Sequence, residues 1–104
     1  MSARVLSTEE LESLTRRANF QPARIAALCD CAPKQLQRDF KRRFRETPEN
    51  WARRLRCRLA KDMIVLGSDN KTVVSELKFT DQAHLCHEFQ YFYSAEVILN
   101  SVEI

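Results

Sequence analysis

One segment of the chain carries four long polar side chains at positions i, i+3, i+4 and i+7, namely Lys34, Gln37, Arg38 and Lys41. This spacing places all four on one face of an α-helix. The opposite face carries Leu36, Phe40 and Phe44, which predicts a helix with one buried and one exposed side. Arginine can bind guanine O6 and N7 with two hydrogen bonds, and glutamine can bind adenine in the same way. The exposed face therefore has the chemistry to read bases in a major groove, and a solvated basic face is the alternative interpretation.

The elements that must position this face are predicted to be helices. Ser7 followed by Glu10 forms a capping box, and the prolines at 22, 33 and 48 each suit the first turn of a helix. Apolar spacing predicts about seven helices, covering approximately residues 8–18, 22–29, 33–45, 47–67, 68–78 and 80–92 and a short last segment from Ser94. No segment alternates with period two over the length of a strand, and the single glycine argues against tight hairpins. The sequence therefore predicts an all-α fold.

The chain contains an internal repeat. Residues 25–31 align with residues 73–79 at an offset of 48, and the Leu-x-x-x-Phe pair at 36 and 40 aligns with the pair at 85 and 89 at an offset of 49. A helix, a short turn and a second helix therefore occur twice, and a long helix joins the two units. In a helix-turn-helix the second helix enters a major groove. The predicted parts are a first helix-turn-helix subdomain at 1–46, a linker helix at 47–67 and a second, acidic subdomain at 68–104.

The repeated units resemble a known family. Residues 25–41, IAALCDCAPKQLQRDFK, resemble the first helix-turn-helix of the AraC/XylS family of bacterial transcription regulators. Thr47-Pro48 matches the family's Ser/Thr-Pro, residues 56–64 resemble its linker helix, and residues 79–85, FTDQAHL, resemble its second unit. The resemblance extends over about residues 11–99. It implies two helix-turn-helix subdomains, double-stranded DNA as the partner and a role in transcription regulation.

The second unit departs further from the family's pattern than the first. Lys78 and Ser94 stand where the family has glycine, and Val97 stands where a proline follows. Asn70 stands where an apolar residue usually opens a helix, and in the first unit Arg45 replaces a glycine. We therefore expect the fold to be kept, while base reading rests mainly on the first unit.

The resemblance also implies which side chains read bases. The matching positions are three in the first unit and four in the second, namely Lys34, Gln37, Arg38, Gln82, Ala83, His84 and His87. Contacts to the DNA backbone are expected from residues at the end of the recognition helix and on the linker helix, namely Lys41, Arg42, Arg45, Thr47, Asn50 and Arg54. Thr47 and Asn50 would contribute backbone N–H groups of a helix N-terminus. Arg43 and Arg56 are expected to meet phosphates or solvent.

Charge is distributed unevenly along the chain. Residues 1–61 hold 15 Lys and Arg against 7 Asp and Glu, whereas residues 62–104 hold 2 against 7. The first part suits a polyanion such as DNA, and the second part would be repelled by it. An alternative function is therefore a protein-interaction module that keeps the fold and uses its acidic part to bind a partner, such as RNA polymerase or another protein.

No cofactor, metal ion or catalytic group is expected. Cys29 and Cys31 belong to one unit and His84, Cys86 and His87 to the other, so they do not offer the four converging ligands of a zinc site. The sequence has no arrangement of nucleophile and base or of paired carboxylates that indicates an enzyme. No apolar run approaches the roughly 18–20 residues of a membrane span, and no membrane partner is expected.

The expected location is the cytoplasm, at the nucleoid when DNA is bound. The N-terminal residues have no apolar signal core, so the four cysteines are expected to be free thiols in a reducing compartment. A separate effector-binding domain does not fit in 104 residues. The chain is therefore expected to be either a stand-alone regulator or the DNA-binding part of a longer protein.

Overall fold

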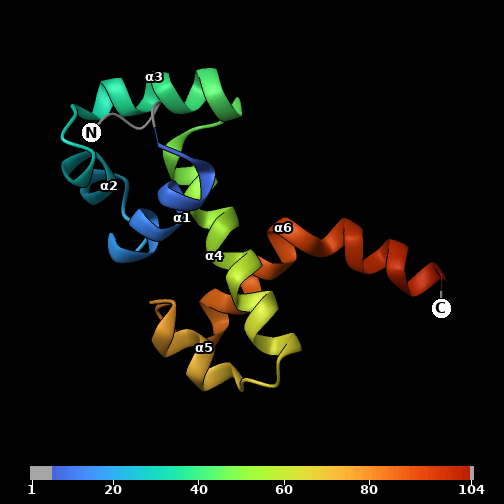
Figure 1. Ribbon diagram of the computed structural model, residues 1–104. Helices are drawn as coiled ribbons and strands as arrows, with labels where there is room; N and C mark the ends of the chain where they lie inside the picture. The colour runs from blue at the N-terminus through green and yellow to red at the C-terminus, as the bar shows by residue number, and fades with distance from the viewer. Residues whose placement is uncertain (1–5, 104) are drawn as a thin grey trace. The chain divides into compact units, whose positions relative to one another are not determined.

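The computed structural model describes the backbone of residues 6–103 and the side chains of residues 6–93. Within this range the chain forms six helices and no strand (Figure 1), namely α1 (Thr8–Arg17), α2 (Pro22–Leu28), α3 (Pro33–Phe44), α4 (Pro48–Val65), α5 (Asn70–Glu76) and α6 (Gln82–Glu103). The predicted all-α class is confirmed. No helix among the described residues is long and apolar enough to cross a membrane.

The number of helices differs from the sequence prediction because α6 is continuous. A break before Ser94 was predicted, yet α6 runs without interruption from Gln82 to Glu103. Helices are ended by glycine and proline, and this segment contains neither. Ser94 and Val97 occupy the two positions where a glycine and a proline would have stopped the helix. The prediction of a separate seventh helix was therefore wrong.

The helix starts follow the predicted capping signals. The Ser7 hydroxyl accepts the Glu10 backbone N–H at 3.1 Å, and the Ser7 N–H donates to the Glu10 carboxylate at 3.4 Å. At α5 the Asp69 carboxylate accepts the Thr72 N–H at 2.8 Å. Hydrogen bonds with the side chain and with the backbone N–H of Thr72 hold the pKa of the Asp69 carboxyl below its ordinary value. Such side-chain caps satisfy N–H groups that the first turns of α1 and α5 leave unpaired, whereas α2 and α3 begin at a proline without a side-chain cap.

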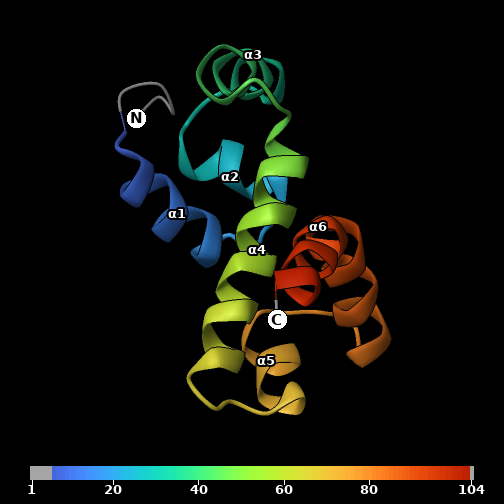
Figure 2. The ribbon, with the colours of Figure 1, turned by 90° about the vertical axis from the view of Figure 1, so that its right-hand side faces the viewer.

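The chain divides into two compact units, which meet in sequence at Arg56 and Cys57 inside α4. In the first unit α1 packs against α2, and α2 packs against α3. Its most deeply buried side chains include Leu11, Ile25, Leu36 and Phe40. In the second unit α5 packs against α6, as Figures 1 and 2 show, and Val73, Leu77 and Leu85 are buried. The subdomain ranges 1–46, 47–67 and 68–104 stay predictions.

The internal repeat is visible in the backbone of the two turns. Asp30 follows α2 with φ +54°, and Lys78 follows α5 with φ +62°, 48 residues further on. In the first turn the N–H of residue 31 donates to the carbonyl of residue 26 at 3.1 Å, and in the second the N–H of residue 79 donates to the carbonyl of residue 74 at 3.1 Å. Both helices therefore end in the same left-handed cap, in which glycine is the favoured residue.

Replacing Lys78 with glycine should stabilise the chain. A side chain in the left-handed region costs roughly 1–2 kcal/mol, and the greater flexibility of unfolded glycine offsets part of this gain. We expect Lys78→Gly to raise the free energy of unfolding by about 0.5–1 kcal/mol in urea titrations.

Gly67→Ala is the control for Lys78→Gly, with the opposite expected change in stability. Its φ is +101°, and no heavy atom lies within 4 Å of a Cβ added there, so Gly67→Ala strains only the backbone. We expect Gly67→Ala to lower stability. If Lys78→Gly also lowered it, the assigned conformation of the second turn would be wrong.

Candidate nucleic-acid interface

Helix α3 of the first unit has the two faces that the sequence predicts. Leu36 and Phe40 are each 1% exposed, and Phe44 is half-buried. Five polar side chains on the other side are exposed, namely Lys34, Gln37, Arg38, Lys41 and Arg42. A helix whose apolar side is fixed in the core must turn its polar side to solvent. The predicted base-reading residues of α3 are therefore accessible to a ligand.

These residues surround one open hollow. It has a volume of about 710 Å³ and is lined by Lys34, Gln37, Arg38, Lys41, Arg42 and Thr47. Four of the six lining residues are cationic, and none is acidic. Like charges gathered on one surface raise the local concentration of an anionic ligand. The structure thus brings together six of the thirteen predicted DNA-contact residues, including all three predicted base readers of the first unit.

Three aromatic rings hold α3 against the start of α4. The centroids of Phe40 and Trp51 lie 5.2 Å apart with the rings at 81°, and the centroids of Phe44 and Trp51 are also 5.2 Å apart. Phe40 and Phe44 are 5.2 Å apart within α3. Such edge-to-face and tilted pairs add about 0.5–1.5 kcal/mol each beyond the area that they bury. This ring cluster, Phe40, Phe44 and Trp51, places Thr47 beside the exposed face of α3.

Two arginines expected to meet phosphates or solvent are structural instead. The Arg43 guanidinium donates to the backbone carbonyl of Leu6 and, at 3.3 Å, to the hydroxyl of Thr8. Arg56 is buried, lies 4.6 Å from the centre of the Phe20 ring and donates to the Asn19 carbonyl at 3.2 Å. The two hydrogen bonds to backbone carbonyls each join residues that lie 37 positions apart in sequence, so the local pattern of charge did not reveal them.

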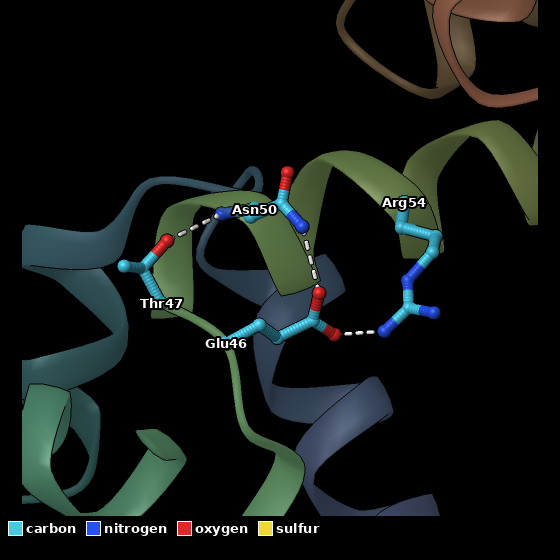
Figure 3. A network of polar contacts seen from close by, with 4 residues as sticks. All are labelled: Glu46, Thr47, Asn50 and Arg54. Carbon is cyan, nitrogen blue, oxygen red and sulfur yellow. Dashed lines mark hydrogen bonds and ion pairs between the residues drawn. The ribbon is translucent and has the colours of Figure 1, made fainter.

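The N-terminal end of α4 carries a polar network, shown in Figure 3. The Thr47 hydroxyl accepts the Asn50 backbone N–H at 3.2 Å and so caps the helix. The Glu46 carboxylate accepts the Asn50 side-chain amide at 2.7 Å and forms an ion pair with Arg54. Asn50 and Arg54 therefore both have protein partners, although the sequence predicts that they contact the DNA backbone. Arg45, the C-cap of α3, is exposed with φ +59°.

Sequence reasoning did not single out Glu46. Its position four residues before Asn50 and eight before Arg54 is the signal that could have found the network. Glu46 precedes the first residue of α4, however, and the spacing rules for helical neighbours apply only inside a helix.

In the second unit, Gln82, Ala83 and His87 are exposed on α6, as the sequence predicts for residues that read bases. His84 is half-buried, and its side chain contacts the residues just before α6. Its Nδ1 accepts the Thr80 backbone N–H at 3.1 Å, and its ring packs edge-on to Phe79 at 5.3 Å. Its Nε2 lies 4.0 Å from the Glu88 carboxylate.

Two of the four cysteines, Cys29 and Cys57, are buried as structural residues are, whereas Cys31 is half-buried and Cys86 is exposed. All four are free thiols, and Cys29 is buried at the end of α2. Burial and the neighbouring Cys31 raise the pKa of the Cys29 thiol, and burial and Asp39 raise the pKa of Cys31. A raised pKa disfavours the reactive thiolate. Among the described residues, no group of three or more His, Cys, Asp and Glu side chains is placed to hold a metal ion.

Trp51 should control the stability of the first unit. Trp51→Ala removes the ring that both phenylalanines of α3 contact, and such truncations of buried aromatic residues cost about 3–5 kcal/mol. We expect a loss of this size in urea unfolding, whereas Trp51→Phe, which retains a ring, should lose much less. An alanine variant as stable as the wild type would show that the ring cluster does not hold α3.

The geometry is that of two helix-turn-helix units, one of which presents a basic hollow. A family model described as a helix-turn-helix domain matches residues 25–95, which is more than half of the chain. A search of curated proteins and a search of solved structures each found no match. The chain therefore belongs to the AraC-type helix-turn-helix DNA-binding domains, a non-enzymatic family whose partner is DNA and whose role is transcription regulation.

Proposed function

We propose that the chain binds a specific site in double-stranded DNA by placing the exposed face of α3 in the major groove. The observation that carries this proposal is the hollow along α3, where four cations and one glutamine face solvent without an acidic neighbour among the lining residues. A helix of this kind fits the major groove, and side chains with two donors or with donor and acceptor distinguish base pairs there.

The side chains around the hollow divide into two roles. Arg38 binds the O6 and N7 atoms of a guanine, Gln37 binds an adenine, and Lys34 reads a neighbouring base from the first turn of α3. Lys41, Arg42 and Arg45 lie toward the end of α3 and bind phosphates, together with the backbone of Thr47. Phosphate contacts fix the register of the helix on the duplex, and base contacts select the sequence.

The second unit contributes less to sequence reading. In this proposal α6 enters the next groove about one helical turn along the same face of the DNA, with Gln82, Ala83 and His87 toward the bases. These three exposed residues carry no permanent positive charge. His84 is the weakest of the four predicted readers, because its ring already accepts the Thr80 N–H and packs on Phe79.

One observation favours a protein partner as a second function. At the end of α4, Val65 is 76% exposed and Leu66 is 85% exposed, and Ile64 beside them is also exposed. Neighbouring exposed apolar residues are a feature of protein-binding surfaces. RNA polymerase or another protein could contact this part of the acidic unit while α3 holds DNA. Such a chain would work in the cytoplasm of a bacterium, at the nucleoid.

Selection from a pool of fragmented genomic duplex tests the DNA-binding proposal. We expect the wild-type chain to enrich a motif, and Arg38→Ala to lower affinity for it about 5–150-fold, as the loss of a two-bond guanine contact worth about 1–3 kcal/mol predicts. The loss should be concentrated at one base position. Arg16→Ala, which removes the same charge from an exposed site on α1, is the matched control and should change affinity little.

The form of the motif decides the role of the second unit. Two boxes about one helical turn apart would mean that α3 and α6 both read bases. A single box would assign the specificity to α3 and leave the acidic unit for a protein partner. If the folded wild-type chain enriched no sequence, the proposed function would be wrong, and capture of protein partners would be the next experiment.

A further inference from the structure

Glu46 lies two residues before the start of α4 and next in sequence to Thr47, which lines the hollow. One carboxylate oxygen of Glu46 accepts the Asn50 side-chain amide at 2.7 Å, and the other pairs with a terminal nitrogen of the Arg54 guanidinium (Figure 3). The Glu46 side chain is only 12% exposed, whereas the Arg54 side chain is 56% exposed. Glu46 is thus held in place by the fold, and Arg54 is the partner that can move.

This network opposes the predicted role of Arg54. The Arg54 side chain is predicted to contact the DNA backbone, and Glu46 carries the same charge as a phosphate. A phosphate that approaches Arg54 must either take the guanidinium from Glu46 or accept a carboxylate as its neighbour. Both routes reduce the electrostatic gain, because an arginine already paired with a carboxylate contributes little net positive charge.

We propose that Glu46 is an affinity-limiting residue, which competes with a DNA phosphate for Arg54. The inference rests on the proposed function, since it concerns the strength of that DNA complex. Phosphate contacts tighten binding to every sequence alike. By withholding one such contact, Glu46 keeps the chain from accumulating on non-target DNA and leaves recognition to the base-reading face of α3.

Salt dependence of binding tests this competition. The logarithm of the binding constant falls with the logarithm of salt concentration with a slope of about −0.9 for each phosphate neutralised. Glu46→Gln removes the charge and keeps the size of the side chain. We expect it to steepen the slope by about 0.9 and to tighten binding to a mixed-sequence duplex roughly three- to eightfold at about 0.1 M salt.

Two comparisons test whether the freed Arg54 guanidinium causes the change in slope. In an Arg54→Ala background, Glu46→Gln should not steepen the slope, because the freed guanidinium is absent. Glu49→Gln removes the same charge from an exposed position in the first turn of α4 and should leave the slope unchanged. Thermal unfolding of each variant shows whether it is folded before its affinity is compared.

The possible outcomes separate this inference from the proposed function. Weaker DNA binding by Glu46→Gln would mean that Glu46 positions Arg54 for DNA. An equal gain in DNA affinity with Arg54 present and in the Arg54→Ala background would mean that Glu46 acts by general charge repulsion. Either result, or an unchanged slope, would contradict the proposed competition between Glu46 and phosphate. The proposed function would still stand if Arg38→Ala lowered affinity for the selected site. If no variant bound any duplex, the proposed function would fail, and the inference with it.

Discussion

The interface depends on the contact of three rings, Phe40 and Phe44 of α3 with Trp51 of α4. Because these rings occupy the inner side of α3, the polar side chains of the opposite face are exposed, namely Lys34, Gln37, Arg38, Lys41 and Arg42. The same contact brings the start of α4 to the hollow, so that Thr47 lines it beside four cations of α3. The exposure of the basic residues therefore depends on the apolar residues that fix the rotation of the helix.

Arginine has two different functions in this chain, and its partners distinguish them. Arg43 and Arg56 donate to backbone carbonyls and lie against aromatic rings, which is how a guanidinium is accommodated inside a fold. Arg38 is exposed on the hollow, where none of the lining side chains is acidic. Arg54 stands between these cases, since it is exposed and yet paired with Glu46. Net charge alone would have assigned all four to DNA.

Local signals predicted the fold, and contacts distant in sequence explain what was missed. The capping box at Ser7 and the periodicity of α3 depend on residues at most a few positions apart, so the sequence alone revealed the helix starts and the exposed face. The inward turn of Arg43 depends on Leu6, 37 residues away. The ring of His84 accepts the Thr80 N–H just before its own helix. The sequence predicts instead that His84 reads bases. In α6, apolar spacing predicts a break before Ser94, yet residues 82–103 contain neither glycine nor proline to end the helix, and α6 continues.

The most direct test of major-groove insertion is methylation of the selected duplex by dimethyl sulfate, which modifies guanine N7 in the major groove and adenine N3 in the minor groove. The structure predicts that the wild-type chain protects guanine N7 within the box read by α3. Arg38→Ala, at a concentration that restores occupancy, should lose protection at one guanine. Protection confined to adenine N3, or a guanine pattern unchanged by Arg38→Ala, would contradict the placement of α3 in the major groove.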